Sequence, residues 1–218
     1  MRSALDRLRQ ILALALTALF GAVPVTQPAA AGEPAPTIII LDGSGSMWGV
    51  VGGQRKLAIA RQTVGPSVSR LPPGRAVGLM AYGHRRKGDC GDIELVVPPA
   101  ANAGPAVGEA VQAMHFLGMT PLADAVRKAA EALRYKEAPA TVVLITDGAE
   151  TCEGDPCAVA GELKKSGVNF TAHVIGLGLT REEERKVACI ASNTGGRYLD
   201  AGDAAALDRA LAETLTTP

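Results

Sequence analysis

The feature that most constrains the fold is a regular alternation of short apolar runs with segments of helical spacing. Thr37 to Leu41 is a continuous and largely β-branched run, which is typical of a strand buried on both faces. Continuing this reading along the chain predicts strands over 37–41, 76–82, 93–97, 141–146, 170–177 and 197–199. The segments between them predict helices over 54–71, 103–114, 121–135, 156–166, 181–193 and 203–215.

Strands that alternate with helices over the length of one domain predict an α/β fold. The expected architecture is a doubly wound, mainly parallel sheet with helices on both faces. Only a short polar loop separates 76–82 from 93–97, so the second of these strands is expected to be antiparallel and to lie at the sheet edge.

Residues 1–31 are expected to lie outside this fold. A basic start is followed by an apolar run over 11–25 and by small residues at 29–31, the layout of a secretory signal peptide. An uncleaved anchor is the alternative, but the run is shorter than the roughly 20 apolar residues that span a bilayer. We therefore expect a short linker over 32–36, a single domain over 37–216, and no membrane span after signal removal.

The charge balance narrows the class of partner. The chain carries 22 Lys and Arg against 22 Asp and Glu, whereas nucleic-acid-binding domains have a clear basic excess. Aromatic residues make up only 3% of the chain, which argues against aromatic platforms for single strands. We expect no nucleic-acid partner.

All four cysteines follow the expected signal peptide. An even count in an oxidising compartment, periplasmic or extracellular, favours two disulfides. The expected bridges join Cys90 to Cys152 and Cys157 to Cys189, with a local Cys152–Cys157 bridge as the rival pairing. A structural zinc site is the other alternative, but it would favour paired cysteines two residues apart, and four residues separate Cys152 from Cys157.

Three polar segments would meet at one edge of the predicted sheet. Asp42 to Ser46 directly follows the first strand, Asp147 directly follows the strand over 141–146, and Thr120 stands at a helix entrance. Ligands of such sheets bind outside the carboxyl ends of the strands. The segments supply two carboxylates and three hydroxyls, and these hard oxygen donors suit Mg²⁺ or Mn²⁺.

The spacing within the first segment supports this interpretation. Asp42, Ser44 and Ser46 are alternate residues, so an extended or gently curled loop would turn their side chains the same way. Gly43 and Gly45 between them are expected to let the backbone bend tightly. Two carboxylates can balance a divalent ion while one coordination position stays open for an acidic group of a partner.

The pattern Asp42-x-Ser44-x-Ser46, with Thr120 and Asp147 downstream, resembles the metal-ion-dependent adhesion site (MIDAS) of von Willebrand factor type A (VWA) domains. The resemblance covers about residues 35–215 and implies the Rossmann-like fold of that family. It implies that Ser44, Ser46 and often Thr120 bind the metal directly, and that both aspartates act directly or through water. The segments 82–86 and 151–157 are similar to a bacterial exported subgroup.

Several neighbours of this set admit two interpretations. Asp124 lies one helical turn after Thr120, where it would either support the metal shell or favour the helix N-terminus. Trp48 would either form an apolar rim beside the metal or be partly buried. The basic loop over 85–87 would attract an acidic partner or simply be a solvated hairpin end. We expect His115 and His173 in the core.

The sequence therefore predicts an exported protein-binding module that recognises an Asp or Glu side chain of a partner through Mg²⁺ or Mn²⁺. Loops around Trp48, Arg85 and Met119 would set its specificity, and no catalytic residue is expected. One alternative is a Mg²⁺-dependent phosphate-ester hydrolase with Asp42 as nucleophile, although Ser44 stands where such enzymes place a second Asp. The other is a structural domain whose metal only stabilises the loops.

Overall fold

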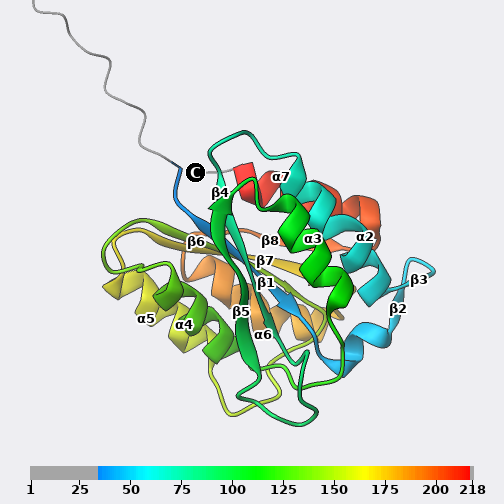
Figure 1. Cartoon of the computed structure of the whole chain (residues 1–218). Coiled ribbons are helices and arrows are strands. Elements are labelled where there is room, and N and C mark those ends of the chain that lie inside the picture. The colour runs from blue at the N-terminus through cyan, green and yellow to red at the C-terminus, as the bar shows by residue number, and fades with distance from the viewer. Residues whose placement is uncertain (1–33, 217–218) are drawn as a thin grey trace, which may run out of the picture. The chain divides into compact units, whose positions relative to one another are not determined.

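The computed structural model describes residues 34–216 (Figure 1). The expected signal peptide over 1–31 and the first part of the linker lie outside these residues, and 34–36 have no regular secondary structure. None of the helices within 34–216 has the length and apolar character needed to cross a bilayer.

The core of the fold is a six-stranded sheet with the strand order β5-β4-β1-β6-β7-β8. Every neighbouring pair is parallel except β4 and β5, which are antiparallel at the edge. This arrangement confirms the predicted fold class. The strands are β1 (Thr37–Asp42), β4 (Ala76–Tyr82), β5 (Ile93–Ala101), β6 (Ala140–Thr146), β7 (Phe170–Leu177) and β8 (Tyr198–Ala201).

Helices cover both faces of the sheet, because the central strands are apolar on both sides (Figure 1). Within β1, Ile38 and Ile40 face one apolar cluster while Ile39 and Leu41 face the other. The first cluster holds α4 (Leu122–Ala132), α5 (Pro156–Ser166) and α6 (Arg181–Ser192). The second holds α2 (Lys56–Ser69), α3 (Gly104–Ala113) and α7 (Ala204–Thr216).

The main differences from the prediction are at β5 and before α2. β5 extends to Ala101, beyond the expected end at 97, although it passes through Pro98 and Pro99. An edge strand tolerates proline because one of its sides has no partner that needs the missing N–H. A small hairpin of β2 (Val50–Val51) and β3 (Gln54–Arg55) precedes α2, where the prediction began the helix at residue 54.

Two disulfides join loops and helices around the sheet. Cys90 pairs with Cys152 at a Cα–Cα distance of 6.0 Å, and Cys157 pairs with Cys189 at 5.3 Å. The first links the loop after β4 to the loop after β6, and the second links α5 to α6. The structure therefore contains both of the expected bridges and not the local Cys152–Cys157 bridge.

Candidate metal centre

Asp42 ends β1 and is fully buried. Its Oδ1 accepts a hydrogen bond from the backbone N–H of Ser44 at 2.8 Å. Its Oδ2 accepts from the Tyr82 hydroxyl at 2.6 Å, from Thr146 Oγ1 at 2.9 Å and from the backbone N–H of Asp147 at 3.3 Å. Four donors from three strand ends thus hold this carboxylate in one orientation.

A chain of hydroxyls connects the loop after β1 to Asp147. Ser46 Oγ donates to Asp147 Oδ1 at 2.7 Å, and Ser44 Oγ lies 2.7 Å from Ser46 Oγ. Because the Ser46 proton goes to the carboxylate, Ser44 is the donor of the second bond. Three of the predicted ligand residues therefore share one hydrogen-bonded chain, and Asp42 adjoins it through the backbone.

Lys56, the first residue of α2, supplies the one ammonium group of this cluster. Its Nζ lies 2.9 Å from Asp147 Oδ2, and the two side chains are 12% and 0% exposed. This residue was not predicted from the sequence, because a lysine at a helix start is typical of an exposed position. Tyr82 was not predicted either. It pairs with Asp42 in the parallel register of β1 and β4, and each of the two is the last residue of its strand.

Burial and mutual repulsion raise the pKa values of two groups here. Burial, followed by the charge of Asp42, raises the pKa of Asp147 to about 6. The same two causes raise the pKa of Tyr82 well above its ordinary value, so its hydroxyl stays protonated and remains a donor to Asp42. A nearby cation would favour the charged form of Asp147 and oppose this effect.

Thr120 lies on the neighbouring loop that leads into α4, and its side chain is buried. A β-bridge pairs Ser44 with Gly118, which places this loop beside the loop after β1. The Thr120 backbone is fixed by Thr151, which accepts from its N–H at 2.8 Å and donates to its carbonyl at 3.1 Å. Thr120 therefore adjoins the cluster, but its hydroxyl has no hydrogen bond to the other four residues of the predicted set.

The two glycines of the loop have different roles. A Cβ at Gly43 would lie 2.4 Å from the Tyr82 carbonyl oxygen, so only glycine allows β1 to continue this close to β4. A Cβ at Gly45 would meet no atom within 4 Å, and Gly45 does not have a positive φ. A close approach therefore requires glycine at position 43, whereas neither a close approach nor a positive φ requires it at position 45.

The donor set fits a hard divalent cation. Two buried carboxylates, Asp42 and Asp147, lie beside a single ammonium group, and within residues 34–216 no second Lys or Arg forms an ion pair with either. A buried charge without a partner is costly, and a cation at this place would remove that cost. The same range contains no cluster of three or more His, Cys, Asp or Glu residues suited to a metal, so hydroxyls would complete the coordination.

Asp124 does not contact the cluster. It is exposed in the first turn of α4 and lines a cavity of about 580 Å³ between the start of α4 and the loop after β6, together with Glu150, Glu153 and the Cys90–Cys152 disulfide. Glu150 accepts hydrogen bonds from the backbone N–H groups of Ala123 and Cys152, and burial raises its pKa. Three carboxylates, those of Asp124, Glu150 and Glu153, therefore line this cavity.

The other residues singled out from the sequence are distributed as follows. Trp48 is 52% exposed and ends the 3-10 helix Gly45–Trp48, which carries Ser46. His84 is buried and bonds Glu94 at 3.0 Å, although the loop over 85–87 that follows is exposed. His173 is buried as expected, but His115 is exposed, which corrects the expectation of a core residue. Met114 and Phe116 on either side of His115 are buried, so the alternation of an extended segment turns His115 outward.

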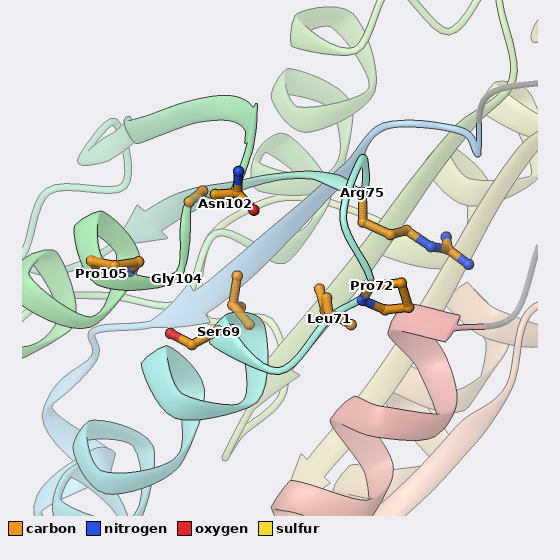
Figure 2. Close-up of a pocket in the computed structure, with 9 residues that line it drawn as sticks. Ser69, Leu71, Pro72, Arg75, Asn102, Gly104 and Pro105 are labelled. Carbon is orange, nitrogen blue, oxygen red and sulfur yellow. The ribbon is translucent and has the colours of Figure 1, made fainter.

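A second cavity of about 250 Å³ lies at the opposite edge of the sheet, between the end of α2 and the start of α3 (Figure 2). None of the predicted ligand residues lines it. Arg75 at its border donates to the Thr216 carbonyl at 2.8 Å. The predicted ligand residues lie instead at the carboxyl ends of the strands, away from this cavity.

Comparison with known proteins agrees with the fold. Residues 37–150 match the family model of the von Willebrand factor type A domain. The chain is 32% identical over 184 residues to YwmD, an uncharacterized protein of Bacillus subtilis (strain 168), covering 79% of this chain and 81% of that protein.

Two solved structures share the fold. An aerotolerance-related membrane protein from Bacteroides fragilis superimposes with a TM-score of 0.68 at 20% identity, covering 84% of this chain and 98% of that one. The pilus adhesin SpaC from Lactobacillus rhamnosus GG gives a TM-score of 0.68 at 16% identity, covering 85% of this chain and 30% of the adhesin. Because the family model matches more than half of this chain, the chain belongs to the von Willebrand factor type A domain family.

Proposed function

We propose that this protein is an exported, metal-dependent protein-binding module. The five residues of the predicted set would hold Mg²⁺ or Mn²⁺: Asp42, Ser44, Ser46, Thr120 and Asp147. The metal would then accept a Glu or Asp side chain of a protein partner. The observation that carries this proposal is the pair of buried carboxylates, Asp42 and Asp147, of which only Asp147 has an ion-pair partner, Lys56, among the residues that the structure describes. VWA domains commonly serve as adhesion and protein-interaction modules, and SpaC, which shares the fold, is a pilus adhesin.

The predicted ligand residues would have different roles at this site. Asp42 contributes charge from a fixed position, because Tyr82 and Thr146 occupy its Oδ2. Ser44 and Ser46 present hydroxyl oxygens that now bond each other. A bound divalent cation would supply an electrophilic position for a carboxylate of the partner.

The arrangement of Asp42 argues against a hydrolase. A nucleophilic aspartate must reach the substrate with one of its oxygens. Asp42 is fully buried, so a substrate could not reach its carboxylate without a movement of the surrounding loops. We therefore propose a binding role without catalysis.

Export is supported by the two disulfides. Disulfides persist in oxidising compartments and are rare in the cytosol. All four cysteines of the chain are paired in the structure, which fits a periplasmic or secreted protein.

Calorimetry on the purified, disulfide-bonded protein tests the metal site. We expect saturable binding of Mg²⁺ or Mn²⁺ that is lost in Asp147→Ala and weakened in Ser46→Ala. Because Ser46 is exposed, its replacement by alanine tests the site without removing a buried side chain. Glu131→Gln is the matched control, because it removes an exposed carboxylate from the far end of α4.

Two results would contradict the proposal. If the protein bound no divalent cation, or bound it equally well after both site substitutions, the predicted ligand set would be wrong. If metal raised the melting temperature without enabling any acidic peptide to bind, the metal would have only the structural role.

A further inference from the structure

Thr120 is the member of the predicted ligand set whose position depends on a segment far from it in the sequence. Its side chain is buried, and among the residues that the structure describes its hydroxyl has no hydrogen-bond partner. The hydroxyl oxygen is therefore available to a cation, provided that the backbone holds it in place. Pro121 follows and has no N–H group, so the next residue supplies no backbone donor for this purpose.

Thr151 holds both polar groups of the Thr120 backbone. Thr151 Oγ1 accepts from the N–H of Thr120 at 2.8 Å, and the backbone N–H of Thr151 donates to the carbonyl of Thr120 at 3.1 Å. One bond uses the side chain of Thr151 and the other uses its backbone. The pair therefore fixes Thr120 on both of its backbone groups, which need partners because the residue is buried.

The residue before Thr151 caps the helix that follows Thr120. The N-cap residue of α4 forms no capping hydrogen bond with its own side chain, so the N–H groups of the first turn need other acceptors. Glu150 Oε2 accepts from the N–H of Ala123 at 2.9 Å, and Glu150 Oε1 accepts from the N–H of Cys152 at 2.9 Å. Glu150 therefore joins its own loop to the first turn of α4.

The loop that carries Thr151 is also the loop that begins with Asp147. At its start, the backbone N–H of Gly148 donates to Thr146 Oγ1 at 3.4 Å, next to the end of β6. Further along, the disulfide of Cys152 joins it to the loop after β4. A loop held at both places keeps the Thr151 hydroxyl at a set distance from Asp147.

Thr151 differs in exposure from the residues that it would position. Thr151 is exposed, whereas Thr120 and Asp147 are buried. A substitution at Thr151 therefore changes the hydrogen bond to Thr120 without opening a cavity in the core.

We infer that Thr151 is a positioning residue of the candidate metal centre: it holds the Thr120 backbone so that the Thr120 hydroxyl stays within reach of a divalent cation shared with Asp147. Glu150 supports this role by fixing the start of α4. Thr151 acts through Thr120 and is not itself a ligand. The inference rests on the proposed function, because it concerns the same divalent cation.

Titration of the purified, disulfide-bonded protein with Mn²⁺ alone tests this inference, with the free ion measured by electron paramagnetic resonance. Thr151→Val removes the hydroxyl and keeps the branched shape of the side chain. It is expected to weaken Mn²⁺ binding about tenfold, which corresponds to the loss of one hydrogen bond of ordinary strength. Thr151→Ser keeps the hydroxyl and is the matched control, so its affinity should stay within about twofold of the wild type.

A double-mutant cycle shows whether Thr151 acts through Thr120. Thr120→Val removes the hydroxyl that Thr151 would position, so adding Thr151→Val to this variant is expected to change its Mn²⁺ affinity by less than about twofold. If Thr151 only stabilised the fold, Thr151→Val would lower the melting temperature in EDTA and leave the Mn²⁺ affinity unchanged. Thr151→Ala repeats the comparison with a smaller side chain, in case valine prevents folding.

The outcomes separate this inference from the proposed function. Mn²⁺ binding that is lost in Asp147→Ala but unchanged in Thr151→Val would overturn the inference and leave the proposed metal site standing. An effect of Thr151→Val that persisted in full in the Thr120→Val variant would also overturn it, because Thr151 would then act on another part of the site. A wild-type protein that bound neither Mn²⁺ nor Mg²⁺ would defeat the proposed function first, and the inference with it.

Discussion

Replacing Lys56 by methionine is expected to strengthen Mg²⁺ binding and to destabilise the metal-free protein. Lys56 Nζ lies 2.9 Å from Asp147 Oδ2 and is largely shielded from solvent. Methionine keeps an unbranched stem but removes the charge. The substitution therefore separates the electrostatic role of Lys56 from its packing.

The size of the effect follows from Coulomb's law. Even at the dielectric constant of water, two unit charges about 4 Å apart interact by about 1 kcal/mol. A divalent ion doubles this energy, so an ammonium group and a divalent ion that share one carboxylate repel each other by about 2 kcal/mol. Removal of that repulsion corresponds to about thirtyfold tighter Mg²⁺ binding. In the metal-free protein the same change breaks a buried ion pair, which costs about 3 to 5 kcal/mol of unfolding free energy.

Calorimetric titration with Mg²⁺ and urea denaturation in EDTA measure the two effects. Lys128→Met is the control, because Lys128 is exposed on α4 and forms no ion pair that the structure shows. An unchanged or weaker Mg²⁺ affinity in Lys56→Met would refute the electrostatic argument and would indicate that Lys56 positions Asp147 for the metal.

Two further outcomes are expected from buried groups around the sheet. Tyr82→Phe removes a fully buried donor to the Asp42 carboxylate and should cost about 2 kcal/mol in urea denaturation; a cost below about 0.5 kcal/mol would show that the bond contributes little. Burial, followed by the charge of Arg197, lowers the pKa of His173. Below pH 6.5 the unfolded chain therefore binds a proton at this residue that the folded chain does not bind, so the free energy of unfolding falls as the pH falls. His173→Gln should flatten that loss, and an NMR titration midpoint of His173 at or above its ordinary value would contradict the sign.

The sheet could be predicted because its strands are apolar on both faces. In β1 the four residues Ile38 to Leu41 are all buried, two on each side, and a run of this kind has few other structural solutions. Asp42 and Asp147 could be placed together for a related reason. Asp42 ends β1 and Asp147 directly follows β6, and these neighbouring parallel strands have their carboxyl ends at the same edge of the sheet.

The contacts around these carboxylates could not be predicted in the same way. The position of the Lys56 ammonium depends on how α2 leaves the β2–β3 hairpin, which is a matter of tertiary packing. The hairpin itself has a sequence signal, because Gly52-Gly53 between two short segments is typical of a two-residue turn. The helical spacing that starts at residue 54 concealed it.

The disulfide between Cys90 and Cys152 has a consequence for the thermodynamics of binding. It connects the loops after β4 and β6, the two strands that flank β1, and therefore spans the strand whose end carries Asp42 and the serines. Loops that become ordered only on association reduce affinity by the conformational entropy that they lose. Here the cross-link imposes that ordering during folding, so a partner of the proposed kind would meet loops whose spacing is already set, and more of the contact free energy would remain as affinity.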